Sequence, residues 1–96
     1  MNIEVTDKAF DWFKNELDVT SGDQIQFFVR YGGDSDFQEG FSIGVIKKEK
    51  DDPSVEVKKE SVVFYIEKKD EWYFDNKDFL VEFNEDIQEI QYKHKK

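Results

Sequence analysis

The spacing of apolar residues in the first part of the chain is helical. Between residues 8 and 17 these residues fall on one broad stripe of a helical wheel, with charged and amide side chains opposite. The stripe consists of Ala9, Phe10, Trp12, Phe13 and Leu17. Thr6 is a favourable N-cap for this segment, and Asp7 places a negative charge where the helix dipole stabilises it. The pattern predicts an amphipathic helix that packs on a core through large aromatic side chains.

After residue 24 the apolar positions mostly alternate with other residues, which is typical of strands. The predicted strands are residues 25–31, 41–46, a short exposed strand around 55–57, a buried strand at 62–67, then 79–83 and a weaker one at 87–92. Gly44 lies inside one of them and predicts either a bulge or a close backbone approach. The basic tail, residues 93–96, is expected to fray.

Residues 70–74 fit two structures. They could form a strand, or Asp70 could begin a single helical turn that turns Trp72 or Tyr73 towards the core. With the helical turn, the order is one helix and about six short strands, the turn preceding the last two. This order predicts one α+β domain over residues 1–96, a mainly antiparallel sandwich-like or barrel-like sheet covered by the N-terminal helix.

The composition predicts a dense core and a strongly charged surface. Of the 96 residues, 39% are charged and 17% are aromatic, and the net charge is −9. This negative charge disfavours nucleic acids and anionic membranes and favours a basic protein partner. The absence of cysteine excludes disulfides, thiolate nucleophiles and cysteine-held zinc or iron–sulfur sites. With neither a membrane-length apolar run nor a signal peptide, we expect a cytoplasmic protein.

Three carboxylates follow the Gly32-Gly33 pair: Asp34, Asp36 and Glu39. Hard cations bind such oxygen ligands, so these residues are the candidates for a weak metal site. The spacing does not match a calcium loop of the EF-hand type, because Glu39 stands where that loop needs glycine and Val45 where it needs glutamate. The competing interpretation, a solvated surface loop, is therefore favoured.

The chain does not present a recognisable catalytic constellation. Gly32 and Gly33 lack the third glycine and following helix of a dinucleotide-binding motif, so they are interpreted as backbone freedom at a strand exit. The single histidine, His94, lies in the basic tail, where a general base would be hard to position. The prediction is a protein that is not an enzyme.

The aromatic residues are too numerous for one face of so small a domain. Most must form the core, but adjacent pairs such as Phe27 with Phe28 leave material for an exposed apolar patch, which would mark an interface. Phe37 is the aromatic residue most expected to be exposed. The predicted interaction loop consists of Asp34, Ser35, Asp36 and Phe37.

Three long segments resemble the HesB-like family of A-type iron–sulfur carriers: VTDKAFDWFKNEL, IQFFVRYGGDSDFQEGFSIGV and VVFYIEKKDEWYFDNKDFLVEF. Together they cover nearly the whole chain, and the resemblance implies a HesB-like fold. In that family the first cluster-binding cysteine follows the glycines directly, which corresponds to Asp34 here, and Ser35 matches the family's serine. The family's C-terminal Cys-Gly-Cys is missing. A cysteine-free branch of largely uncharacterised Gram-positive bacterial proteins resembles this chain more closely.

Because carboxylates are poor substitutes for thiolates on iron–sulfur clusters, the family's cluster carriage does not transfer to this chain, and no cofactor is expected. The leading hypothesis is a non-catalytic binding or adaptor protein, with a link to iron–sulfur metabolism as an option. The alternatives are the weak carboxylate metal site, and an acidic protein that occupies the nucleic-acid site of a basic partner. The sequence is compatible with a homo-oligomer but does not predict one.

Overall fold

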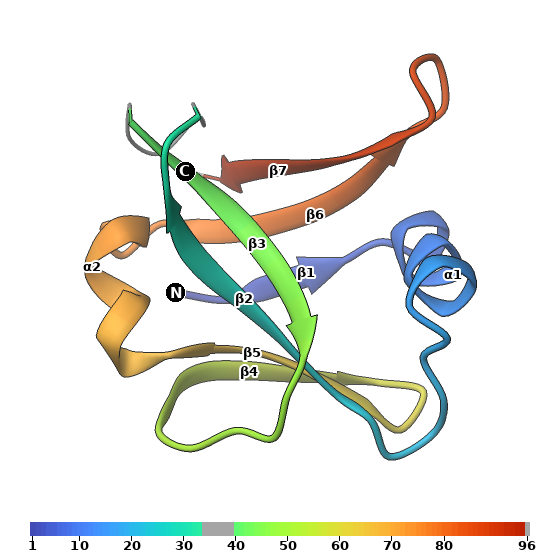
Figure 1. The fold of residues 1–96 in the computed structure, drawn as a ribbon, viewed down its shortest axis with the longest axis horizontal. Coiled ribbons are helices and arrows are strands. Elements are labelled where there is room, and N and C mark those ends of the chain that lie inside the picture. The colour runs from blue at the N-terminus through green and yellow to red at the C-terminus, as the bar shows by residue number, and fades with distance from the viewer. Residues whose placement is uncertain (34–39, 96) are drawn as a thin grey trace.

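In the computed structural model, which describes residues 1–33 and 40–95, seven strands form two sheets that face each other (Figure 1). The elements, in chain order, are β1 (Ile3–Val5), α1 (Asp7–Glu16), β2 (Gln24–Tyr31), β3 (Phe41–Lys47), β4 (Pro53–Lys59), β5 (Val62–Glu67), the 3-10 turn η1 (Lys68–Asp70), α2 (Glu71–Phe74), β6 (Asp78–Asn84) and β7 (Glu89–Lys95). This arrangement confirms the predicted α+β sandwich-like fold.

The larger sheet has the strand order β3-β2-β5-β4, and the smaller has the order β1-β6-β7. Strands that follow one another in sequence pair antiparallel, namely β2 with β3, β4 with β5 and β6 with β7. Two parallel pairs, β2 with β5 and β1 with β6, join segments that are far apart in the chain. The sheet is therefore mainly antiparallel, as expected.

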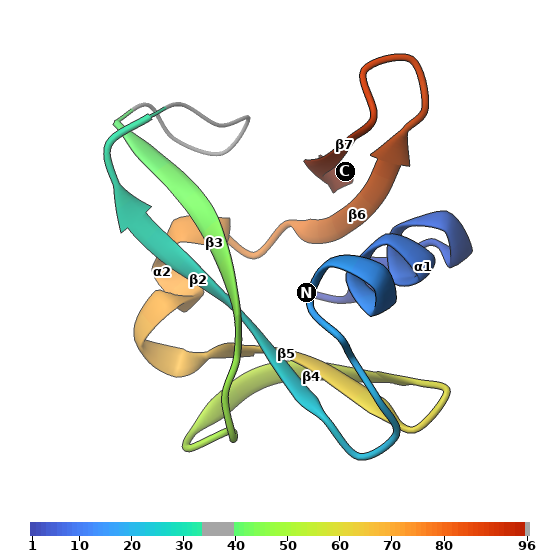
Figure 2. The ribbon, with the colours of Figure 1, turned by 45° about the vertical axis from the view of Figure 1, so that its right-hand side comes forward.

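Helix α1 begins and ends close to its predicted positions. The Thr6 hydroxyl oxygen accepts a hydrogen bond from the backbone N–H of Ala9 at 3.2 Å, as an N-cap does. Its buried face carries Phe10 and Phe13, whose rings pack on Phe64 of β5. Figure 2 shows α1 at the opening between the two sheets, so the helix closes one end of the core.

Aromatic rings from both sheets meet in the centre of the core. Phe27 of β2 stacks on Phe64 with 5.9 Å between ring centroids and contacts Phe79 of β6 edge-on at 5.2 Å. Phe79 in turn stacks on Tyr92 of β7 at 5.7 Å. These contacts confirm that many of the aromatic residues serve the core, where each ring buries a large apolar area.

The chain termini depart from the sequence expectation. β1 was not predicted, and it pairs with β6 through bonds such as Phe79 N–H to the Asn2 carbonyl at 2.8 Å. The expectation of a frayed tail is wrong for residues 93–95, because Lys93 and His94 pair with β6 opposite Leu80 and Phe79. The last strand therefore begins later than predicted, at Glu89, and runs further.

The two ambiguous positions are resolved. Residues 71–74 form the helical turn α2, which buries Tyr73 and leaves Trp72 about half exposed. Gly44 marks a close approach and not a bulge, because β2 and β3 pair without a register shift. A Cβ atom on Gly44 would lie only 2.4 Å from Cζ of Phe28, so the Phe28 ring covers this glycine.

Candidate functional site

The predicted interaction loop and metal candidates, Asp34, Ser35, Asp36, Phe37 and Glu39, lie in residues 34–39, outside the described residues. The chain on either side of this segment is closed by a hydrogen bond from Gly32 N–H to the Gly40 carbonyl at 2.8 Å. Gly32, Gly33 and Gly40 all have positive φ, which confirms the interpretation of the glycine pair as backbone freedom at a strand exit. The carboxylate metal site and the nucleic-acid-site hypothesis stay predictions.

Elsewhere, the described residues do not bring three His, Cys, Asp or Glu side chains together in a group that could hold a metal ion. His94, which the sequence assigned to a loose tail, lies in β7 opposite Phe79. Because His94 pairs with Phe79 of β6, it belongs to the smaller sheet.

Three aromatic side chains form an exposed cluster at the end of the β2–β3 hairpin, which we call the aromatic patch: Tyr31, Phe41 and Trp72. The Phe41 ring lies between the other two, with 5.4 Å to each ring centroid. Tyr31 is 91% exposed and Trp72 is 53% exposed, while Phe41 rests on the buried ring of Tyr73 at 6.0 Å. Figure 1 shows this end of the hairpin beside α2. Exposed tyrosine and tryptophan side chains are typical of protein interfaces.

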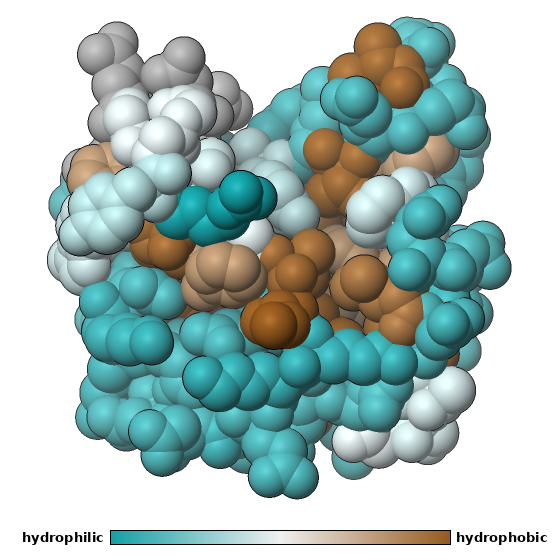
Figure 3. Space-filling model, in the orientation of Figure 1, coloured by the Kyte–Doolittle hydropathy of each residue, from teal (hydrophilic) through white to brown (hydrophobic). Residues whose placement is uncertain are grey.

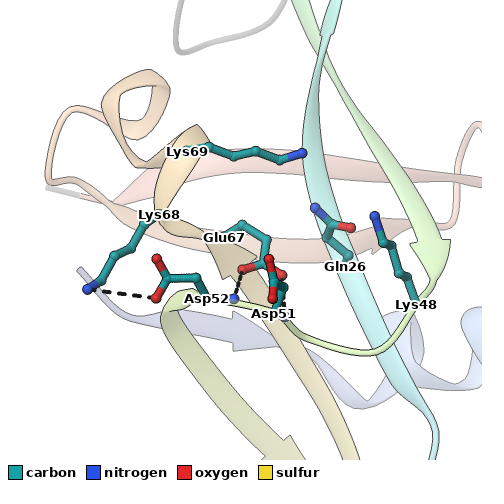
Figure 4. A pocket seen from close by; sticks show the side chains of 7 residues that line it. All are labelled: Gln26, Lys48, Asp51, Asp52, Glu67, Lys68 and Lys69. Carbon is teal, nitrogen blue, oxygen red and sulfur yellow. Dashed lines mark hydrogen bonds and ion pairs between the residues drawn. The ribbon is translucent and has the colours of Figure 1, made fainter.

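A second feature is a polar pocket of about 210 Å³ on the outer side of the larger sheet (Figure 4). Its lining consists of Gln26, Lys48, Asp51, Asp52, Glu67, Lys68 and Lys69. The loop from residue 48 to residue 52 forms one wall, and η1 forms the opposite wall.

Glu67 holds the first wall in place. Its side chain is buried, and its two carboxylate oxygens accept the backbone N–H groups of Asp51 at 2.8 Å and Asp52 at 2.6 Å. The Lys68 N–H donates to the Asp52 carbonyl at 2.9 Å and ties the same loop to η1. A buried carboxylate is costly unless it is hydrogen-bonded, and these bonds supply that compensation.

Tyr65 fixes the other end of this loop. Its hydroxyl donates to the Lys48 carbonyl at 2.6 Å, and burial, with a smaller effect of the Glu67 charge, raises the pKa of Tyr65 to about 12. The hydroxyl therefore stays protonated and keeps its role as a donor at neutral pH. The Lys50 N–H also donates to the side-chain oxygen of Gln24 at 2.7 Å.

Two ammonium groups, those of Lys48 and Lys69, lie at the rim of the pocket on either side of the Gln26 amide (Figure 4). Gln26 is only 4% exposed and forms part of the floor. Nearby, burial raises the pKa of Asp70 above its ordinary value, against a smaller lowering effect of the Val29 backbone N–H. The described residues line the pocket with carboxylate, ammonium and amide groups, so the pocket is suited to binding a small polar group.

Sequence reasoning found only part of these features. It predicted an exposed aromatic patch and named Phe37, which lies outside the described residues; among the described residues, Tyr31 and Trp72 lie at the surface. The pocket was missed. Its one sequence signal is Glu67, a carboxylate that ends an apolar run otherwise read as a buried strand.

The comparisons with known proteins cover the whole length of the chain. Residues 1–96 match the family model described as iron-sulphur cluster biosynthesis. A protein of Bacillus subtilis (strain 168) named pyruvate dehydrogenase inhibitor is 48% identical over 89 residues, which are 93% of this chain and 94% of that protein. An uncharacterized protein of Staphylococcus saprophyticus is 40% identical, over 99% of this chain and all of that protein.

An uncharacterized protein of Staphylococcus haemolyticus is 35% identical over 96% of each chain. No solved structure matches the chain significantly. In the described residues, none of the helices has the length and apolar character needed to cross a membrane. The chain itself has no cysteine, and the match over its full length shows that it belongs to the iron-sulphur cluster biosynthesis, or HesB-like, family.

Proposed function

We propose that this chain is a non-catalytic binding protein that inhibits pyruvate dehydrogenase by direct contact. One observation carries the proposal, namely the 48% identity to the pyruvate dehydrogenase inhibitor of Bacillus subtilis over more than nine-tenths of both chains. This level of identity across a whole domain supports a shared architecture.

The residue chemistry supports binding over cluster transfer. The chain has no cysteine, and iron–sulfur clusters are held by thiolates. The position that resembles the family's first ligand holds Asp34, a hard oxygen donor that suits other cations better than iron in a cluster. A fold that has lost its soft ligands still offers a rigid surface for protein contact.

The aromatic patch is the surface that we propose for this contact. Trp72 and Tyr31 expose large rings, and Phe41 supports both from below. Such rings contribute much of the binding energy of protein interfaces, because they bury a large area and lose little rotamer freedom.

Enzyme inhibition tests the proposal. Purified pyruvate dehydrogenase from the source organism is assayed for NADH formation with increasing amounts of the chain, and the expected result is a saturable decrease in rate. The Trp72→Ala variant should need at least about tenfold more protein for half inhibition, a loss of ~1.4 kcal/mol or more in binding. Ile87→Ala is the matched control, since Ile87 is also 53% exposed but lies in the turn between β6 and β7.

Full enzyme activity at a large excess of the chain would overturn the proposed function. Equal inhibition by both variants would remove the aromatic patch from it. Urea unfolding of the variants checks that a loss of inhibition does not reflect a loss of structure.

A further inference from the structure

The two sheets have four edge strands, and three of them are protected against pairing with another chain. β1 is only three residues long, and it lies against β4. β4 begins with Pro53 and has a register shift between Pro53 and Val55. β7 carries a carboxylate at Glu89, an ammonium group at Lys93 and an imidazole at His94. Short length, proline, irregular pairing and charge are the devices that keep sheet edges from associating.

β3 has none of these devices except a lysine at its end. It is seven residues long and pairs with β2 at every position from Phe41 to Lys47 without a shift. It contains no proline, and its only charged residue is Lys47. Lys47 is exposed, and its ammonium group already contacts the Asp18 carbonyl at 2.8 Å and an Asp23 carboxylate oxygen at 3.4 Å. Within residues 1–33 and 40–95, the free edge of β3 therefore has no such protection.

The pairing pattern identifies the backbone groups that this edge presents. The bonds Gly32 N–H to Gly40 and Lys48 N–H to Gln24 place the hydrogen-bonded pairs at even-numbered positions of β3. Its odd-numbered residues then direct their N–H and C=O groups away from β2.

Apolar side chains line both faces of this edge. Phe41, Ile43 and Val45 point to the inner face, where Phe41 and Val45 are only partly buried. On the outer face Ile46 is 46% exposed. Figure 3 shows apolar atoms gathered in the middle of the face that β3 crosses, with hydrophilic atoms around them.

We propose that β3 binds an extended segment of the partner protein as an added strand, with apolar side chains at alternate positions and basic residues between them. This inference rests on the proposed function for the existence of a protein partner. Seven residues of β3 offer about 23 Å of edge for pairing. The net charge of −9 favours a basic segment as the added strand, because two copies of this chain repel each other whereas a basic segment is attracted.

A synthetic peptide tests the edge without any enzyme. The probe is a capped seven-residue peptide of alternating lysine and valine, and the readout is amide hydrogen exchange resolved by NMR. In the free chain the amides of Ile43 and Val45 should exchange quickly, and the peptide should slow them at least about tenfold. Gly44 and Ile46, which already bond to β2, should change little. A peptide of alternating glutamate and valine is the control and should have no effect.

The Val45→Pro variant removes one outward N–H and leaves the ladder to β2 intact. We expect it to weaken binding of the lysine–valine peptide at least about tenfold, with the fold checked by the unchanged spectrum of β5 and β6. The proposal is overturned if the highest soluble peptide concentration leaves Ile43 and Val45 unprotected, or if Val45→Pro binds as well as the native chain. The proposal is also overturned if the amides of Ile43 and Val45 become protected when only the protein concentration is raised, without peptide. That result would mean that a second copy of the chain binds this edge.

Comparison with the enzyme assay separates this inference from the proposed function. If the peptide protects β3 but the chain does not inhibit pyruvate dehydrogenase, the edge site stands and the proposed function falls. If the chain inhibits the enzyme and the peptide leaves β3 unchanged, the function stands and the edge site falls.

Discussion

Glu67 shows how a single buried carboxylate organises a loop. Both of its oxygens accept backbone N–H groups of the segment that walls the polar pocket, at 2.8 and 2.6 Å. We expect Glu67→Gln to lower the free energy of unfolding by about 1–3 kcal/mol, because the new amide NH₂ would face a backbone donor and leave it unpaired. Urea unfolding measures the change.

Glu71→Gln is the matched control for this prediction. The Glu71 side chain accepts the Ser54 hydroxyl at 2.6 Å in an exposed position, and the remaining oxygen of a glutamine can still accept it. This variant should stay within about 0.5 kcal/mol of the native chain. If Glu67→Gln were equally mild, the carboxylate would not be what fixes the loop.

Gly44 and Phe28 form a coupled pair of residues. The Phe28 ring occupies the space that a Gly44 side chain would need, with Cζ at 2.4 Å and the Arg30 Cδ atom at 2.7 Å from the expected Cβ position. We expect Gly44→Ala to lower the free energy of unfolding by about 1 kcal/mol, because the ring must leave its place. In a Phe28→Ala background the same change should cost at least ~0.5 kcal/mol less. Additive effects in this double-mutant cycle would contradict the coupling.

At the scale of elements, helix α1 (Asp7–Glu16) depends on the N-cap residue that precedes it, Thr6. Thr6 satisfies the Ala9 N–H at 3.2 Å, and a helix N-terminus otherwise leaves this donor unpaired. Thr6→Ala should lower the free energy of unfolding by about 0.5–2 kcal/mol, whereas Thr6→Ser, which keeps the hydroxyl, should have a much smaller effect. Thermal or urea unfolding of the native chain and the two variants measures these changes. An equal decrease in stability for both variants would show that the threonine methyl group stabilises the protein, and not the hydroxyl cap.

Elements with local signals were predictable from the sequence. α1 combines a helical stripe with a capping threonine, and β2 and β3 show clear alternation, so their positions agree with the structure. β1 has only three residues, and its stability comes from β6, as in the bond between Asn2 N–H and Asp78, which are 76 residues apart. β7 likewise continues through Lys93 and His94 because pairing with β6 overrides their low strand preference.

The candidate sites depend on contacts that no local pattern encodes. The aromatic patch joins Tyr31, Phe41 and Trp72, and the sequence could count these rings but could not show which would remain outside the core. The unguarded edge of β3 also follows from strand order alone. The sequence of β3 shows the same alternation as that of β2. Only the sheet topology shows that β2 has a neighbouring strand on each side, whereas β3 has one on one side alone.

At the scale of the whole molecule, the chain keeps the fold of a cluster biosynthesis family without the ligands that hold a cluster. It has no cysteine, and the position that resembles the family's first ligand holds Asp34. Thiolates, and in some centres histidines, hold the irons of such clusters, so the fold alone supplies too little binding energy. Its surface is free to serve protein contact.

The last prediction follows from this loss. The chain, incubated without oxygen with ferrous iron and sulfide and then separated by gel filtration, should retain no sulfur-to-iron charge-transfer absorption and no stoichiometric iron. Asp34→Cys restores one thiolate at the position of the family's first ligand, and it should also fail to hold a stable cluster, since one cysteine leaves most iron coordination unfilled. A cysteine-bearing member of the family, treated identically, shows that the reagents work. A stable chromophore at stoichiometric yield in the native chain would mean that its carboxylates replace thiolates after all, and the case for a purely protein-binding role would lose its chemical basis.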